Sequence, residues 1–339
     1  MSAQGSASPP PTKVVLISSA TATVQDFYAK FATYLSQELG MIVITYDNRG
    51  VGRSMPHAAQ QDLATLKAQI DAAGGAAAVA GSAARFNNNM KNNGNNSKAQ
   101  QKPQKHPLAG FQASLIDWAL KDLAGMFRYI LANWPETPTL FVGHSVGGHL
   151  LPALDPSYTR NVERVLFVAV TSAYWRDMNS PMFMYSLFFL ISPVVNRYYG
   201  YYPGKTLWGA MEDLPFGCFW DWSHWGSYEN YMLGGNPEWT PNYQAFKAPI
   251  YSLYFDDDDF SRNSPPKICN LIPNAMSRPV KLYPKDDLKM SVGHMGFFFG
   301  ACKRKLWETA VRAWLVDGQA LDRDQIKAQA AANTGFARM

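Results

Sequence analysis

Short apolar runs alternate along this chain with stretches in which apolar residues recur every three or four positions. The short runs contain few polar residues, as is typical of parallel strands that are covered on both faces. They predict strands at Val14–Ser18, Met41–Tyr46, Thr139–Val142, Val165–Val170, Ile250–Phe255 and Val280–Tyr283. The helical periodicity predicts helices at Asp26–Leu39, Leu115–Trp134 and Lys303–Val316. This alternation predicts an α/β fold, with a mainly parallel sheet flanked by helices.

Two regions lack this alternation. Residues 56–106 change to Ala/Gly-rich and then Asn-rich sequence. Such a segment cannot bury enough apolar surface to offset the entropy lost on ordering, so we predict a disordered, low-complexity insert. Residues 1–12 are small and polar and are also predicted to be disordered. The folded domain is then expected to span residues 13–316, with 317–339 as a C-terminal tail.

The second interruption, residues 171–247, is crowded with Trp, Tyr and Phe. Because it lies between two predicted strands, we expect it to form a cap over the carboxyl edge of the sheet, where open α/β sheets bind ligands. Within it, Met178–Asn196 contains no charged residue. Pro181 and Pro193 bracket an apolar stretch that is too short to cross a bilayer. A buried or interfacial helix is expected there, which leaves contact with a membrane surface open.

Composition and charge narrow the function classes. A formal net charge of +5, spread over a polar insert and the C-terminal region, gives no ground for predicting nucleic-acid binding. Three widely spaced cysteines form no metal or redox pattern, and no cofactor is predicted. The N-terminus lacks the apolar core of a signal peptide, so a cytoplasmic location is expected. Ala337-Arg338-Met339 has the form of a peroxisomal address, and the peroxisome is the alternative.

The candidate nucleophile is Ser145, in the G-x-S-x-G sequence Gly143–Gly147. The motif follows the strand Thr139–Val142 and precedes the helical run His149–Leu154. On a tight strand-to-helix turn the serine hydroxyl is exposed, and glycine neighbours let the backbones approach. This context distinguishes the motif from a structural glycine turn.

A serine nucleophile needs a base, and the base needs an acid that orients it. Among six histidines only His294 follows the last predicted strand, in a glycine-flanked loop. The acid is expected within Asp256–Asp259, directly after the strand Ile250–Phe255. Asp258 is the first choice and Asp257 the second. A solvated acidic turn remains an alternative for this run, and a cation site is disfavoured because spaced ligands and a glycine are absent.

Acyl transfer also needs hydrogen-bond donors for the developing oxyanion. The backbone N–H of Val146, at the start of the helix, is one candidate. The second is expected in the loop after the first strand, where we choose the N–H of Thr21, with Ala20 as the alternative.

Taken together, these residues resemble the α/β-hydrolase superfamily, near its monoacylglycerol-lipase and serine-aminopeptidase-like branch. The segments that carry the resemblance are Tyr46–Ser54, the Ser145 turn, Gly200–Gly204, Glu212–Pro215, Trp220–Trp225, Asp256–Asp259 and Gly293–Phe298. The resemblance implies Ser145 as nucleophile, Asp258 as acid and His294 as base. It also implies that Arg49 ties loops together and takes no part in the chemistry.

Three departures from the family pattern are visible, of which Asn48, at a position where an aromatic residue is usual, is the least consequential. Ser19-Ala20 stands where His-Gly is common in the oxyanion loop. The family's N-terminal hairpin is missing before the first strand, so Met41–Tyr46 is expected to be an uncovered edge. We expect that edge to pair with another chain, giving self-association, or with an N-terminal extension that this sequence lacks.

The sequence therefore predicts a serine hydrolase that cleaves an apolar carboxylic ester or related acyl compound. Thioesters and amides stay open as substrates. The alternative is a non-catalytic, hydrolase-like protein that binds a small ligand under the cap.

Overall fold

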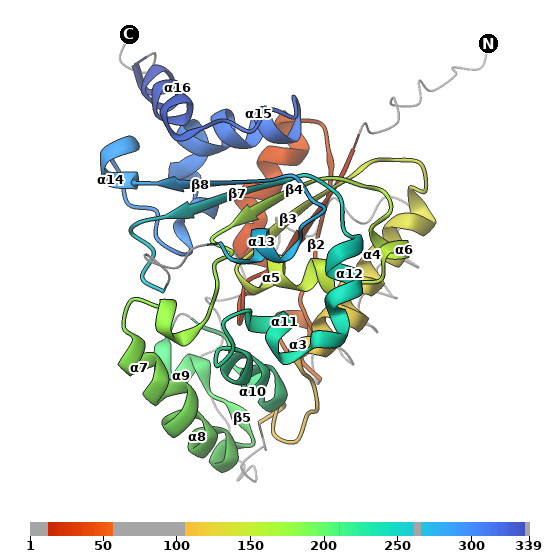
Figure 1. The fold of residues 1–339 in the computed structure, drawn as a ribbon, viewed down its shortest axis with the longest axis vertical. Helices are drawn as coiled ribbons and strands as arrows, with labels where there is room; N and C mark the ends of the chain where they lie inside the picture. Colours follow the sequence, from red (N-terminus) through yellow and green to blue (C-terminus); the bar gives the residue numbers. More distant parts are fainter. Residues whose placement is uncertain (1–12, 57–105, 210, 261–265, 336–339) are drawn as a thin grey trace, which may run out of the picture.

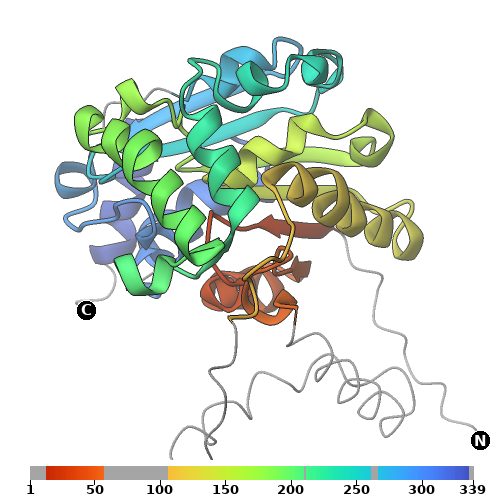
Figure 2. The same cartoon turned by 90° about the horizontal axis from the view of Figure 1, so that it is seen from below.

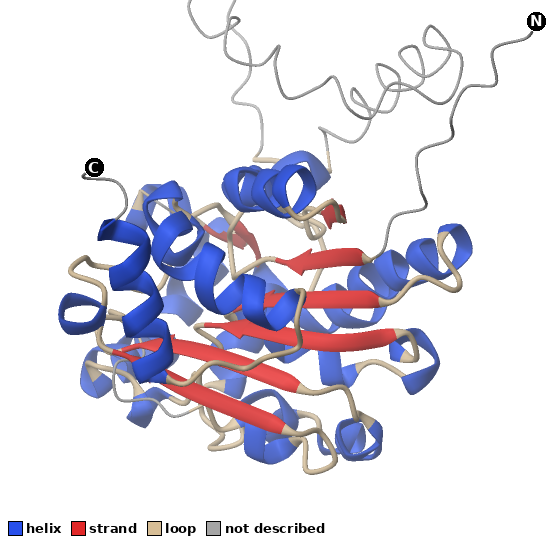
Figure 3. Ribbon diagram, turned by 90° about the horizontal axis from the view of Figure 1, so that it is seen from above, coloured by secondary structure: helices blue, strands red, loops and turns tan. Residues whose placement is uncertain are grey.

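The computed structural model describes residues 13–56, 106–209, 211–260 and 266–335 (Figure 1). In this part of the chain one sheet has the strand order β2-β1-β3-β4-β7-β8, and every neighbouring pair is parallel (Figure 3). Its strands are β1 (Val14–Ser18), β2 (Ile42–Thr45), β3 (Thr139–His144), β4 (Val162–Val168), β7 (Ile250–Phe255) and β8 (Ser277–Leu282). The predicted α/β fold with a mainly parallel sheet is confirmed. Three predictions lie outside the described residues: the disorder of residues 1–12, the insert apart from its two end residues, and the peroxisomal address of the C-terminal tripeptide.

The three predicted long helices are present, each assembled from consecutive helical segments. These are η1 (Gln25–Tyr28), α1 (Ala29–Thr33) and η2 (Tyr34–Glu38); α3 (Leu115–Asp117), η7 (Trp118–Leu123) and α4 (Ala124–Asn133); and η14 (Lys303–Val311) with α15 (Arg312–Leu315). The second begins at Leu115 because Ser114 and Asp117 form a capping box: the Ser114 hydroxyl accepts from the Asp117 N–H, and the Asp117 carboxylate accepts from the Ser114 N–H, both at 3.1 Å.

Shorter elements complete the fold. Those outside residues 171–247 are η3 (Gly52–Ser54), α5 (Val146–Leu150), η8 (Leu151–Ala153), α6 (Pro156–Thr159), α13 (Ile268–Leu271), α14 (Pro284–Asp287), η12 (Gly296–Phe298), η13 (Gly300–Cys302) and α16 (Arg323–Gly335). Those inside residues 171–247 are η9 (Trp175–Asp177), α7 (Pro181–Tyr185), η10 (Ser186–Ile191), α8 (Ser192–Tyr199), β5 (Tyr201–Tyr202), α9 (Gly204–Trp208), β6 (Leu214–Pro215), α10 (Phe216–Trp225), α11 (Tyr231–Gly235), η11 (Pro237–Trp239) and α12 (Thr240–Ala245).

The sheet separates two hydrophobic cores. Because side chains alternate along a strand, Val14 and Leu16 face one core while Val15 and Ile17 face the other, and all four are buried. The first core packs on α3, α4, α5 and α10, and the second on α1, η14, α15 and α16. Each fully buried aliphatic side chain contributes about 1.5–3 kcal/mol through the hydrophobic effect. Helices on both faces therefore hold the sheet, and its carboxyl edge stays free for a site.

Residues 171–247 lie together on one side of the sheet, as the green helices in Figures 1 and 2 show. Their longest helical stretch, from α7 through η10 to α8, exposes apolar side chains such as Met182, Leu190 and Val194. Among the described helices none combines the length and apolarity needed to cross a membrane. Contact with a membrane surface stays a prediction, as does the capping role of this segment.

β2 forms an edge of the sheet within the described residues, because it pairs only with β1 there. Its residues Ile42–Thr45 are all half-buried. The expected edge position of this strand is thus observed, and self-association through it stays a prediction.

The predicted C-terminal tail, 317–339, contains α16, which packs on η14 through buried Ile326 and Ala330. An ion pair holds α16 to α14: Arg323 donates from Nε and Nη2 to the two carboxylate oxygens of Asp287, at 2.8 and 2.9 Å. The Asp287 side chain is fully buried and also accepts the Tyr283 N–H at 2.8 Å. Burial alone would raise the pKa of Asp287, but the hydrogen bonds from Arg323 and Tyr283 outweigh burial, and that pKa is lowered.

We expect Asp287→Asn to lower the free energy of unfolding by about 1.5–3 kcal/mol at neutral pH, since a hydrogen-bonded charge is lost. A carboxylate with a lowered folded-state pKa stabilises the fold above its unfolded pKa, near 3.9, and loses that contribution as the pH falls. The difference between wild type and variant should therefore be constant above about pH 5 and shrink below about pH 4. Urea unfolding across this pH range measures it, with exposed Asp286→Asn on the same helix as the control. An equal loss in both variants would contradict the assignment.

Candidate active site

The candidate nucleophile lies on a strained turn between β3 and α5. Ser145 has φ 52° and ψ −124°, a backbone conformation that non-glycine residues rarely adopt. The turn is tightly packed against the end of β1: a Cβ on Gly147 would stand 2.3 Å from the Ser18 carbonyl oxygen. Only glycine allows this approach, which explains the G-x-S-x-G pattern. The strained turn projects the serine side chain from the carboxyl edge of the sheet.

The structure brings the candidate base, His294, together with Asp258, the first choice of acid. His294 Nδ1 lies 2.8 Å from Asp258 Oδ2. A carboxylate accepts, so Nδ1 carries the proton and donates, and Nε2 keeps its lone pair. Asp258 is 1% exposed, and its other oxygen accepts the Phe260 N–H at 2.8 Å. Both carboxylate oxygens are thereby fixed, which sets the orientation of the imidazole.

Asp257, the second choice, holds the backbone of the histidine loop. Its two carboxylate oxygens accept the N–H groups of Val292 and Gly293 at 2.9 and 3.0 Å. Gly293 has φ +61°, a left-handed conformation that favours glycine. The two neighbouring aspartates therefore contact adjacent parts of one loop, Asp257 its backbone and Asp258 the imidazole.

Ser145 and His294 both line one cavity of about 540 Å³. The cavity lies between the sheet edge and residues 171–247. From 171–247 its wall receives mostly apolar side chains, among them Met178, Phe183, Met184, Leu187, Trp208, Met211 and Trp222. From the sheet side it receives Thr21, Val146 and Phe299 in addition to the serine and histidine. The volume lies within the range typical of small-molecule sites.

The order of the strands and the positions of these residues now identify the fold. A parallel sheet in this order carries the serine turn after β3, the aspartate after β7 and the histidine after β8. The chain has the α/β-hydrolase fold.

No protein-family model and no curated protein matches the sequence. Similar solved structures include one of two metagenome-derived lipolytic enzymes, 12% identical, covering 97% of this chain and 95% of that chain, with a TM-score of 0.46. A thermostable carboxyl esterase from Bacillus coagulans is 10% identical, covering 80% and 82%, with a TM-score of 0.45. A monoglyceride lipase from Saccharomyces cerevisiae is 13% identical, covering 80% and 77%, with a TM-score of 0.43.

The two candidate oxyanion donors of this α/β-hydrolase fold lie in the cavity wall. Thr21 follows β1, and Val146 is the first residue of α5, where helical N–H groups lack partners in their own helix. The alternative donor, the Ala20 N–H, donates to the Tyr28 hydroxyl at 2.9 Å. Because that N–H is engaged, the geometry favours Thr21 over Ala20.

A buried chain of hydrogen bonds behind the site was not predicted from the sequence. The Tyr28 hydroxyl lies 2.8 Å from His144 Nδ1, and His144 Nε2 lies 2.9 Å from the His294 carbonyl oxygen. A carbonyl only accepts, so His144 Nε2 donates and Nδ1 accepts from Tyr28. Burial lowers the pKa of His144 to about 3, which keeps the ring neutral. The chain joins the loop after β1, the serine turn and the histidine loop.

Arg49 ties the segment after β2 to a helix, whereas the resemblance implied a tie between loops. Its side chain donates to Asp122 Oδ1 at 2.9 and 2.7 Å, and its N–H donates to Oδ2 at 3.0 Å. The Arg49 carbonyl in turn accepts the Trp118 indole N–H at 3.1 Å. These bonds fix the segment after β2 on the second long helix, and Arg49 is not among the residues that line the cavity.

Proposed function

We propose that this protein is a serine hydrolase that cleaves an apolar carboxylic ester through an acyl-enzyme on Ser145. The observation that carries the proposal is the Asp258–His294 hydrogen bond of 2.8 Å beside a strained Ser145 in the wall of the same apolar cavity. An acid–base pair that shares a cavity with a half-buried serine is the arrangement that activates a hydroxyl nucleophile.

The reaction follows from the proton positions. Ser145 Oγ attacks the ester carbonyl carbon while His294 Nε2 accepts the hydroxyl proton. The imidazolium is stabilised by Asp258, and the tetrahedral oxyanion accepts from the N–H groups of Val146 and Thr21. Collapse breaks the bond to the alcohol oxygen, which takes the proton from His294. Water then attacks the acyl-enzyme, His294 accepts one water proton, and the proton returns to Ser145 as the acid leaves.

The cavity wall supports an apolar substrate. Met178, Met184, Leu187 and Trp222 present aliphatic, thioether and aromatic surface to any ligand bound beside Ser145. Burying an acyl or aryl group against them releases about 25 cal/mol for each Å² removed from water. The same serine could also attack thioesters and amides. An amide is a poorer match than an ester, because alkoxide leaves without prior protonation more readily than amide nitrogen.

A fluorophosphonate probe tests the proposal directly. We expect the purified protein to form one covalent adduct, which peptide mapping by mass spectrometry should assign to Ser145, with concurrent loss of p-nitrophenyl butyrate hydrolysis. Heat-unfolded protein is the control, because the reaction needs the assembled site. A folded protein that neither reacts with the probe nor hydrolyses esters would favour the alternative, a non-catalytic ligand-binding protein.

A further inference from the structure

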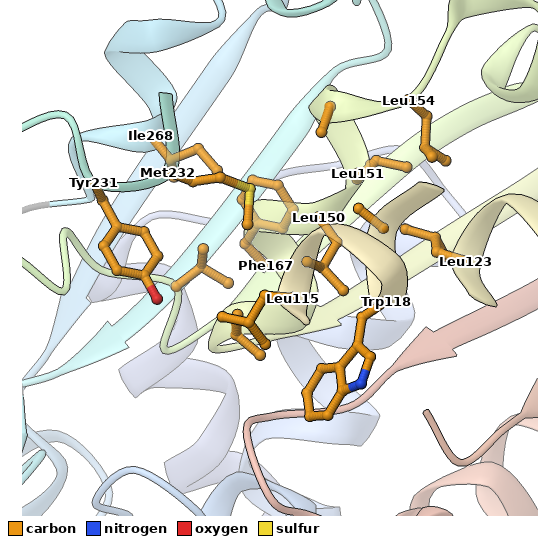
Figure 4. Close-up of a cluster of buried hydrophobic side chains, with 14 of the residues drawn as sticks. Leu115, Trp118, Leu123, Leu150, Leu151, Leu154, Phe167, Tyr231, Met232 and Ile268 are labelled. Carbon is orange, nitrogen blue, oxygen red and sulfur yellow. The ribbon is translucent and has the colours of Figure 1, made fainter. Parts of the chain in front are cut away.

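One wall of the apolar cavity carries two buried polar side chains that the proposed reaction does not use. His149 is 5% exposed and Tyr231 is 2% exposed, and both line the cavity. Their rings pack edge to face, with centroids 4.8 Å apart at 64°. In Figure 4 the Tyr231 hydroxyl points away from the neighbouring Met232 and Ile268.

The protonation of His149 follows from its partner. His149 Nε2 lies 2.8 Å from the Thr171 carbonyl oxygen, which can only accept, so Nε2 carries the proton. Nδ1 then holds a lone pair. Burial lowers the pKa of His149 to about 4, so at neutral pH this nitrogen is a hydrogen-bond acceptor.

Both polar atoms are accessible from the cavity. Within the described residues, His149 Nδ1 and the Tyr231 hydroxyl have no hydrogen-bond partner. In that part of the chain, the unpartnered side-chain atoms that are sealed from solvent belong to Asn48, Asn179, Ser192, Asn196 and Ser252. His149 Nδ1 and the Tyr231 hydroxyl are not among them, so each keeps some accessible surface. A buried polar atom without a partner is unfavourable, so these two atoms are suited to bind a polar group that enters the cavity.

We propose that His149 and Tyr231 form a polar subsite that binds a hydroxyl group of the ester substrate. A hydroxyl can donate to Nδ1 of His149 and accept from the Tyr231 O–H at the same time, and this satisfies both side chains. A carbonyl or ether oxygen accepts only, which would leave Nδ1 unpaired. This inference rests on the proposed function and specifies its substrate class, an ester with an apolar body and one hydroxyl near the reacting carbonyl.

The position of the subsite sets where that hydroxyl must lie. Ser145 immediately precedes α5 and His149 is the fourth residue of that helix, so the subsite lies within about one helical turn of the nucleophile, in the wall of the same cavity. A hydroxyl on the third carbon of the acyl chain, or on the neighbouring carbon of the alcohol, is close enough to the carbonyl attacked by Ser145 to reach this part of the wall.

The test compares pairs of esters whose two members differ by one hydroxyl group. For the acyl side the pair is p-nitrophenyl 3-hydroxybutyrate and p-nitrophenyl butyrate; for the alcohol side it is 2-hydroxypropyl butyrate and propyl butyrate. In wild type we expect kcat/KM for the hydroxylated member of one pair to exceed that of its partner about 10-fold. Tyr231→Phe should lower this ratio of kcat/KM values about 5- to 10-fold, since one hydrogen bond is lost. The pair that responds identifies whether the hydroxyl belongs to the acyl or the alcohol group.

Tyr202→Phe is the matched control. Tyr202 also lines the cavity, but its hydroxyl already accepts the Trp208 indole N–H at 2.7 Å, so the ratio should not change. A wild-type ratio near one for both pairs, or a ratio that Tyr231→Phe leaves unchanged, would overturn the inference while hydrolysis itself stands.

Calorimetric titration of Ser145→Ala, with and without Tyr231→Phe, measures the same preference as affinity for the intact esters. If wild type hydrolyses no ester but the titration still favours the hydroxylated member, the proposed function fails and the subsite is supported. If the titration shows no preference either, both proposals fail.

Discussion

Replacing Ser145 by alanine should lower kcat for ester hydrolysis by about 10³-fold or more and abolish fluorophosphonate labelling. Without the hydroxyl no acyl-enzyme can form, and only water attack assisted by the oxyanion donors remains. Alanine and serine have similar backbone preferences at φ 52°, so the strain of the turn is unchanged. We therefore expect the free energy of unfolding to stay within about 0.5 kcal/mol of wild type.

Ser157→Ala provides the control for this substitution. Ser157 lies on α6, away from the cavity, and it is exposed. It should keep wild-type labelling and turnover. If Ser145→Ala retains most of the activity while it is folded, Ser145 is not the nucleophile, and the attacking group must be sought elsewhere in the cavity.

The sheet could be predicted from the sequence because its strands are covered on both faces. β1 and β7 begin and end at the predicted residues, since each is an apolar run bounded by polar or turn residues. β4 and β8 begin three residues earlier than predicted, at Val162 and Ser277, because charged Glu163, Arg164 and Arg278 interrupt the apolar pattern near their N-terminal ends. Strand ends of this kind depend on pairing with neighbouring strands and not on local hydrophobicity.

The helix of residues 181–199 shows a different limit. Pro181 and Pro193 were expected to bracket an apolar stretch, yet helical structure continues through Pro193. Pro181 opens α7, as proline does at a first helical turn. Pro193 lies inside this continuous stretch, two residues after the π-helical segment η10 ends. The pattern alone cannot show that two short helices join end to end.

In the candidate site, the serine, the histidine and the first choice of acid follow from local sequence, and the contacts between distant segments do not. Ser145 lies in a motif whose glycines have a steric reason, and His294 has flanking glycines. The Tyr28–His144 bond joins residues 116 positions apart, and only packing brings them together. His149 could have been noticed, because it is a histidine in the first turn of the helix that directly follows the nucleophile.

Asp258→Asn should lower kcat about 10³- to 10⁴-fold, whereas Asp257→Asn should lower it about 10-fold or less. Asp258 uses one oxygen for His294 Nδ1–H and the other for the Phe260 N–H, so both positions require acceptors. Asparagine has only one acceptor oxygen. If its NH₂ faces His294, the proton moves to Nε2, which then cannot accept from Ser145. If the oxygen faces His294, the charge that stabilises the imidazolium is still lost.

Asp257→Asn is a matched control because it removes the same charge one residue away. Asparagine at 257 loses one of the two bonds to the Val292 and Gly293 N–H groups, which should cost about 1–2 kcal/mol of loop stability and leave the imidazole partner in place. Steady-state kinetics and thermal unfolding of both variants separate the two roles: a comparable loss of stability in both variants, and a large loss of kcat in Asp258→Asn alone. Equal losses of kcat would mean that the carboxylates act as a unit, and a greater loss in Asp257→Asn would reassign the acid to that residue.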